Sequence, residues 1–261
     1  MPSFEDYFDR HEFVQMTRAK NGVLEVVLHT DGGSLRWGTA AHRCLTRAFR
    51  DIALDRGNSA VLLTGSGEEF LGPRASEPDG KTAGPDRNAT YWEREAFSDG
   101  REMVNAILDI PVPVICAVNG PVRRHCETAL LSDVIIASET ASFEDSAHFH
   151  LQNLVPGDGI HVVSTMLMGV NRARAFMYTG SVIDAAEALR LGLVAEVLPA
   201  ADVLPRAREI ADQIAAKPDI TRRFTRALLV QPIRKQMVDL LGMGFAYEGL
   251  AAMGRNDPPE S

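Results

Sequence analysis

Residues 143–159, FEDSAHFHLQNLVPGDG, place two histidines shortly before an aspartate that lies between two glycines. Imidazole has an ordinary pKa of about 6.5, so His148 or His150 can accept a proton from water near neutral pH. A carboxylate such as Asp158 can fix the tautomer of a neighbouring imidazole and stabilise its protonated form. The segment therefore points to general acid–base chemistry.

Structural roles compete with this interpretation. Asp158 is also well placed to cap a helix that begins at Gly159, and the two roles are compatible. His148 and His150 would point to opposite faces of a strand, so we do not expect them to share a zinc ion. The sequence contains no cluster with metal-ligand spacing, and we expect no metal.

The elements that must carry these side chains alternate between strands and helices. Residues 22–30 and 59–66 are apolar runs typical of strands. Residues 39–55 repeat apolar side chains at three- and four-residue steps, which is typical of an amphipathic helix. Strand, helix, strand in this order favours the α/β class with a parallel sheet.

Residues 71–90 are rich in proline, glycine and charge, and a loop of this length is usually functional or disordered. Asp219 is expected to cap a helix. Helices are further predicted at 91–110, with a break near Gly100, at 127–133, in two short segments after Asp158, and at 233–253. Strands are predicted at 112–118 and 134–138, and a helix, a turn and a strand at 184–199.

Composition limits the classes of function. The chain has 261 residues, 45% of them hydrophobic, which suits one large domain or one domain with a small helical appendix. A formal net charge of -8 argues against nucleic-acid binding, which needs a basic surface. Three cysteines do not form a disulfide framework, and Cys116 is expected to be a buried, inert thiol. Without a signal-like or membrane-spanning apolar run, we expect a cytoplasmic protein with no membrane partner.

A more specific pattern covers residues 114–199. The stretches PVICAVNGPV, ETALLSDVIIASETASF, LVPGDG and ARAFMYTGSVIDAAEALRLGLVAEVLP resemble the crotonase (enoyl-CoA hydratase/isomerase) superfamily. The resemblance extends over nearly the whole chain. It implies the crotonase fold, with a stacked ββα superhelix over residues 1–200. A C-terminal helical region over 201–261 is then expected to form homotrimers, or hexamers that are dimers of trimers.

The sequence departs from acyl-CoA members at three places. They carry a glycine run before Glu127 that helps to form an oxyanion hole, whereas residues 123–125 here are Arg, Arg and His. The second oxyanion loop contains Pro73, which has no N–H group. Ala147 stands where hydratases have their second catalytic glutamate. A hydratase working with two glutamates would therefore have lost one.

One branch fits these departures better. The stretches SLRWGTAAH, NGPVRRHCE, FEDSAHF, VPGDG and GFAYEGLAA are similar to 6-oxocamphor hydrolase and related β-diketone hydrolases. Those enzymes cleave the C–C bond between two ketones by a retro-Claisen reaction, without coenzyme A. The resemblance implies that His148 and Asp158 form the catalytic dyad and that His125 contacts the substrate carbonyl. The residues implied to line or support the site are Trp37, His42 and Glu248, with Glu127 as a further candidate. The segment between His148 and VPGDG is one residue longer than the resemblance implies, so His150 competes with His148.

Hydrolysis of a cyclic β-diketone requires residues of these types. Water must be deprotonated as it attacks one carbonyl, the oxyanion must be stabilised, and the departing enolate must be protonated. His148 with Asp158 suits the first demand, and His125 with the Trp37 indole N–H suits the enolate oxygen. We expect a cofactor-free hydrolase of a small cyclic β-diketone. The alternatives are an acyl-CoA hydratase or isomerase, which Glu127 would support, and a non-catalytic scaffold.

Overall fold

The computed structural model describes residues 3–75 and 88–254. Its centre is a six-stranded sheet in the order β1-β2-β3-β4-β5-β8. The strands are β1 (Val14–Arg18), β2 (Val23–Leu28), β3 (Ala60–Gly65), β4 (Val114–Val118), β5 (Val134–Ser138) and β8 (Glu196–Leu198). β1 pairs antiparallel with β2, and each later neighbour pairs parallel. The predicted α/β class is thus confirmed.

A second, narrower strip of strand pairing runs beside this sheet. Single bridges join Arg36 to Gly72, Leu71 to Val122, and Val122 to Phe143. The strip ends in β6 (Ser142–Phe143), which pairs with β7 (Ile183–Asp184). Successive turns of the chain therefore contribute one segment to each strip, as the predicted stacked ββα superhelix requires.

Helices cover both faces of the large sheet. They are α1 (Thr39–Leu54), α2 (Ala89–Tyr91), α3 (Asp99–Asp109), α4 (Glu127–Leu130), α5 (Phe149–Gln152), α6 (Ile160–Met168), α7 (Val170–Thr179), α8 (Ala185–Leu191), α9 (Ala200–Ala215), α10 (Asp219–Leu229) and α11 (Gln231–Gly254). A short 3₁₀ turn spans Phe4–Asp6. None of the helices in the described ranges is both long and apolar enough to cross a membrane.

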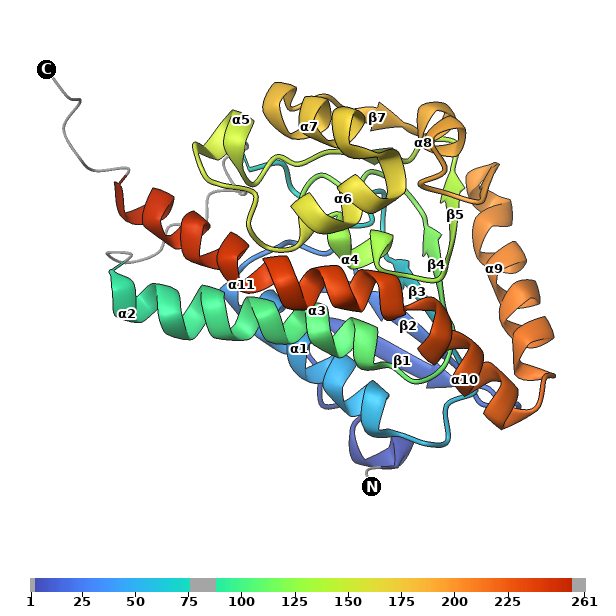
Figure 1. Ribbon diagram of the computed structural model, residues 1–261. Helices are drawn as coiled ribbons and strands as arrows, with labels where there is room; N and C mark the ends of the chain where they lie inside the picture. The colour runs from blue at the N-terminus through green and yellow to red at the C-terminus, as the bar shows by residue number, and fades with distance from the viewer. Residues whose placement is uncertain (1–2, 76–87, 255–261) are drawn as a thin grey trace, which may run out of the picture.

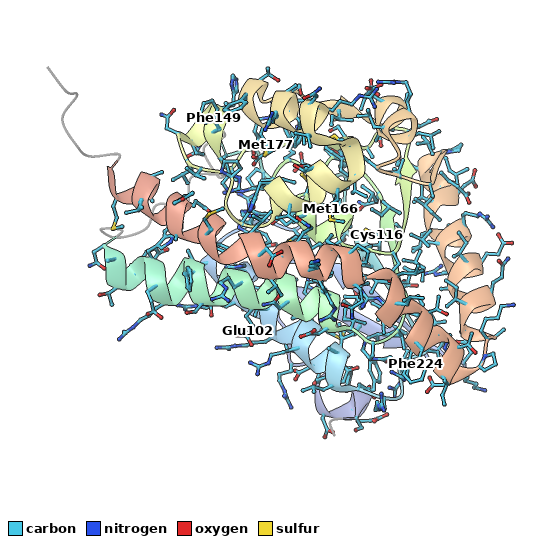
Figure 2. All side chains as sticks on the ribbon, viewed as in Figure 1. Glu102, Cys116, Phe149, Met166, Met177 and Phe224 are labelled. Atoms are coloured by element: carbon cyan, nitrogen blue, oxygen red, sulfur yellow. The ribbon has the colours of Figure 1, made fainter. Side chains whose placement is uncertain are left out.

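The sheet is apolar on both sides because its strands alternate between two cores. In β3, Val61 and Leu63 join the larger core, whereas Ala60 and Leu62 face α9 on the other side. Figure 1 shows α9 on one side of the sheet, while α1, α3 and α11 lie together on the other. Cys116 is fully buried in β4, as predicted, and burial raises the pKa of its thiol (Figure 2).

Several predicted details differ. The helix expected at 91–110 has no break near Gly100: α2 continues through a π-helical stretch, Trp92–Ser98, into α3. Gly100 serves packing instead, because a Cβ there would lie 2.4 Å from the ring of Phe245. Asp219 is the first residue of α10 rather than its cap, and it pairs with Arg222 and Arg223. Of the loop expected at 71–90, residues 76–87 lie outside the described residues.

Candidate active site

The narrow strip of strand pairing brings the candidate residues together at one cavity. Trp37 directly follows the strip at Arg36, and His125 follows it a few residues after Val122. His148 follows β6 in the same way, so equivalent positions of successive turns meet. They border a cavity of about 140 Å³. All seven candidate residues line it: Trp37, His42, His125, Glu127, His148, Asp158 and Glu248.

His148 is held by an aspartate that sequence reasoning missed. His148 is 1% exposed, and its Nδ1 lies 2.7 Å from Oδ1 of Asp145. Its Nε2 lies 3.4 Å from Oδ2 of Asp158 and 3.6 Å from Oε1 of Glu248. The expected arrangement, with Asp158 behind the imidazole, is therefore wrong: Asp145 is behind it and Asp158 is on the other nitrogen. The only sequence signal for Asp145 is its position three residues before His148.

His125 sits between the acidic residues of the site. Its Nδ1 lies 2.9 Å from Oδ2 of Asp158 and 3.1 Å from Oε1 of Glu127. Its ring stacks on Trp37, with centroids 4.1 Å apart, and meets the ring of His148 edge to face at 6.0 Å. The backbone of His125 is left-handed, with φ of 51°, a conformation that side-chain-bearing residues seldom adopt outside constrained sites.

His150 does not reach the cavity. Residues 149–152 form α5 rather than a strand, with His148 at its N-cap, so the two histidines diverge by helical geometry. His150 is exposed, and its ring packs against Gly180. The geometry leaves His148 as the histidine of this segment that faces the site.

Asp158 lies one residue before Gly159, the N-cap of α6, so it is not the capping residue that the sequence suggested, but its two oxygens reach both the helix start and the imidazoles. Its Oδ1 accepts a hydrogen bond of 3.2 Å from the backbone N–H of Ile160, the first residue of α6. Its Oδ2 faces His125 and His148. A helix start therefore fixes the carboxylate between the two imidazoles.

Burial and mutual attraction set the charges. Burial disfavours charge on both histidines, but the carboxylates Asp145 and Asp158 raise the pKa of His148 well above its ordinary value. Glu127 likewise raises the pKa of His125 against the effect of burial. Burial would raise the pKa of Asp158, but the charge of His148 and the hydrogen bond from His125 hold it below the usual range.

The two glutamates and His42 respond mainly to burial. Burial, followed by the charge of Asp158, raises the pKa of Glu127 to about 7. Burial also raises the pKa of Glu248 above its ordinary value. The pKa of His42 falls to about 4, through burial and then the charge of His125, so this ring is neutral at physiological pH. The cavity thus holds two imidazoles with raised pKa values, His125 and His148, beside two carboxyl groups whose pKa values are also raised.

One group of side chains could reach a single metal ion. Among the described residues, ligand atoms of His125, Glu127 and Asp158 lie within 4.8 Å of one another. Sequence spacing could not reveal this group, because Asp158 lies far along the chain from the other two. Their short contacts also suit an imidazole N–H that hydrogen-bonds to two carboxylates.

The loops that carry oxyanion donors in acyl-CoA members are tied together by ion pairs. Glu144 accepts from Arg74 at 2.8 Å and from Arg123 at 3.5 Å, and Arg123 also binds Glu69. The N–H of Ala75 donates to Oγ of Ser146 at 3.1 Å. The described part of this region is therefore braced by side chains where those enzymes have a glycine run.

Helix α11 brings Glu248 to the site through two close approaches. Gly244 and Gly157 meet backbone to backbone, since a Cβ on Gly244 would lie 2.5 Å from the Gly157 oxygen. One turn later, Gly249 packs on Trp92, whose indole N–H donates to the Phe245 carbonyl at 3.0 Å. Glu248 lies between these two contacts, which set its position relative to His148.

Comparison with known proteins identifies the family. The sequence matches the enoyl-CoA hydratase/isomerase family over residues 20–242. It is 31% identical over 201 residues to the crotonyl-CoA hydratase of Syntrophomonas wolfei, covering 72% of this chain and 73% of that protein. It is 30% identical over 202 residues to the short-chain-enoyl-CoA hydratase of Clostridium acetobutylicum, covering 77% and 73%.

A solved structure adds a second comparison. A β-diketone hydrolase from the cyanobacterium Anabaena sp., bound to (S)-3-oxocyclohexyl acetic acid, matches with a TM-score of 0.90 and 38% sequence identity. The match covers 97% of this chain and 98% of that one. The chain therefore has the crotonase fold and belongs to the enoyl-CoA hydratase/isomerase family.

Proposed function

We propose that this chain is a hydrolase that cleaves a C–C bond of a small cyclic β-diketone by a cofactor-free retro-Claisen reaction. The observation that carries the proposal is a pair of imidazoles, His148 buried and His125 15% exposed, that face one small cavity with Asp158 between them. The likeness to the cyanobacterial β-diketone hydrolase supports the substrate class.

The reaction follows from the positions of the ring nitrogens. His148 in its neutral form takes a proton at Nε2 as the oxygen of water attacks one carbonyl carbon. The tetrahedral oxyanion collapses, the C–C bond breaks, and its electron pair leaves as an enolate of the second ketone. His125 has Nδ1 bound by carboxylates, which leaves Nε2 to hydrogen-bond the enolate oxygen. The imidazolium of His148 then protonates the enolate carbon, and the product is a keto acid.

The rival is an enoyl-CoA hydratase or isomerase that acts on an acyl-CoA thioester. Glu127 favours it, because this carboxyl is fully buried at the cavity wall and stands where hydratases have their first glutamate. The hydratases among the relatives also favour it. Ala147 counts against it, since it lines the same cavity where a second glutamate would be needed. The ion-paired loops around Glu144 count against it as well.

The test is turnover of a bicyclic 1,3-diketone with no cofactor added, followed by loss of substrate and appearance of a keto acid. We expect cleavage by the wild type and a fall of about 10²–10⁴-fold for His148→Ala, the usual contribution of a positioned general base. His150→Ala is the matched control, because it removes an exposed imidazole from the same segment. Hydration of crotonyl-CoA without any diketone cleavage would overturn the proposal in favour of the rival.

A further inference from the structure

His148 has two nitrogens in different surroundings, and only one makes a short hydrogen bond. Nδ1 lies 2.7 Å from Asp145, within the range of a charge-assisted bond. Nε2 is 3.4 Å from Asp158 and 3.6 Å from Glu248, both longer than a normal hydrogen bond. The imidazole is therefore fixed from the Nδ1 side and open to a reacting molecule on the Nε2 side.

Asp145 is itself held by its two neighbours in the chain. The N–H of Glu144 donates to the Val122 carbonyl at 3.1 Å, and the N–H of Ser146 donates to the Arg123 carbonyl at 3.3 Å. The Glu144 carboxylate is also bound by two arginines. The backbone on both sides of Asp145 is thus held by the neighbouring turn, with Asp145 Oδ1 at hydrogen-bonding distance from His148.

We propose that Asp145 is the positioning residue of this site: it holds the proton of neutral His148 on Nδ1 and so leaves Nε2 as the atom that accepts a proton from water. This assigns to Asp145 the part that the sequence suggested for Asp158. Asp158 instead lies between Nδ1 of His125 and Nε2 of His148, on the reacting side. The catalytic consequence rests on the proposed function, whereas the place of the proton does not.

The charges around His148 come from four parts of the chain. Asp145 lies on the same segment as His148. Asp158 and His161 lie at the start of α6. Glu248 lies on α11, and His125 lies before α4. Removing the charge of Asp145 leaves the other groups in place. The pKa of His148 must then fall, and the Nδ1 proton loses its acceptor.

The test is NMR of protein labelled with ¹⁵N and ¹³C in histidine, with the His148 signals assigned by their loss in His148→Gln. In the wild type we expect the neutral ring to carry its proton on Nδ1. In Asp145→Asn we expect the proton to move to Nε2 and the pKa to fall by one unit or more. Asp158→Asn is the matched control, and it should leave the proton on Nδ1 because it changes only the Nε2 side.

Turnover supplies the second readout. If the diketone is the substrate, Asp145→Asn should lower kcat by ten- to 10⁴-fold, as loss of the orienting carboxylate does in catalytic triads. A wild-type His148 with its proton on Nε2 would overturn the proposal, and this needs no variant. So would a proton that moves in Asp158→Asn but not in Asp145→Asn. Absence of diketone turnover alongside the expected NMR result would overturn only the proposed function.

Discussion

Two imidazoles of this site, His148 and His125, each have their own carboxylate, and they share a third. Asp145 binds His148, Glu127 binds His125, and Asp158 faces both rings. Because the carboxylates and His148 are buried, His125 is nearly so, and all are in contact, each ionisation depends on the others, and the groups titrate as a set rather than singly. The pH dependence of this protein is consequently a direct probe of the arrangement.

Activity should rise with pH on the acid side, with a midpoint above 6.5. Asp145 and Asp158 raise the pKa of His148 despite burial, so the neutral base becomes abundant only above its ordinary pKa. The measurement is kcat/KM for the diketone from pH 5 to 9. Glu127→Gln is the control, because a limb that comes from His148 should persist in it. A flat profile across this range would contradict the assignment.

Stability should respond to Glu127 in the opposite direction. Its folded-state pKa of about 7 lies above the unfolded value of 4.5, so its contribution is fully present below pH 4.5 and is lost as pH rises to 7. Relative to Glu127→Gln, the wild type should lose up to about 3 kcal/mol of unfolding free energy over this window. Urea unfolding at several pH values measures it, and a constant difference between the two proteins would argue against a raised pKa.

Sequence reasoning could place seven side chains in one cavity because the family pattern fixes their positions. It could not say which carboxylate stands behind His148, because that depends on how a turn of three residues is folded. Asp145 and Asp158 are equally plausible by type. The choice between them is set by the hydrogen bonds and ion pairs that hold residues 144–146 against the neighbouring turns.

At the scale of elements, the narrow strip and α11 position the site. The large strands were predictable from their apolar runs, whereas β1, with five residues of alternating burial, was not. The narrow strip was equally hidden, because single bridges such as Leu71 to Val122 have no periodicity. The continuous helix through Gly100 was missed because a glycine needed for packing looks like a helix breaker in sequence.

Docking of α11 can be tested with two of its glycines. A Cβ at Gly244 would lie 2.5 Å from the backbone of Gly157, so Gly244→Ala must push the helix away and move Glu248. We expect a loss of about 1–3 kcal/mol of unfolding free energy, the usual range for overpacking, together with lower activity.

Gly242 on the same helix has nothing within 4 Å of its Cβ position. Gly242→Ala should therefore stabilise the protein by about 0.5–1 kcal/mol through helix propensity alone. Thermal and urea unfolding of the two variants makes the comparison. Equal stability of both alanine variants would mean that α11 does not depend on the Gly157 contact.

The bracing ion pairs can be tested in the same way. Glu144 is buried and accepts from Arg74 and Arg123, so Glu144→Gln leaves charge-assisted hydrogen bonds unmade. We expect a loss of about 1.5–3 kcal/mol of unfolding free energy. Glu196→Gln, which breaks a more exposed pair with Arg206, should change it by less than about 1 kcal/mol. Similar losses in both variants would show that the ion pairs of Glu144 contribute no more to stability than the more exposed pair of Glu196.

At the scale of the whole molecule, α10 has its arginines on the buried face and its large apolar side chains on the exposed face. Its arginines point inward, where Arg226 binds Asp133 and Arg223 donates to the Asn58 carbonyl at 3.2 Å. Its apolar side chains point outward: Phe224, which is labelled in Figure 2, is 70% exposed, and Leu228, four residues later, is 72% exposed. An exposed apolar helix face of this kind is typical of a surface that another protein covers. The sequence suggested a helical oligomerisation region here from the family resemblance, but only burial shows which face is left open.

We therefore expect the protein to assemble as a homotrimer or a hexamer, with α10 in the contact between copies. Phe224→Glu combined with Leu228→Glu places two charges on this apolar surface, and light scattering after size exclusion should show a smaller species. Asn171→Glu is the control, because it adds a charge to an exposed position on α7, which lies at the top of Figure 1, whereas α10 lies at the lower right. A monomeric wild type, or a double variant of unchanged mass, would mean that the outward face of α10 has another use.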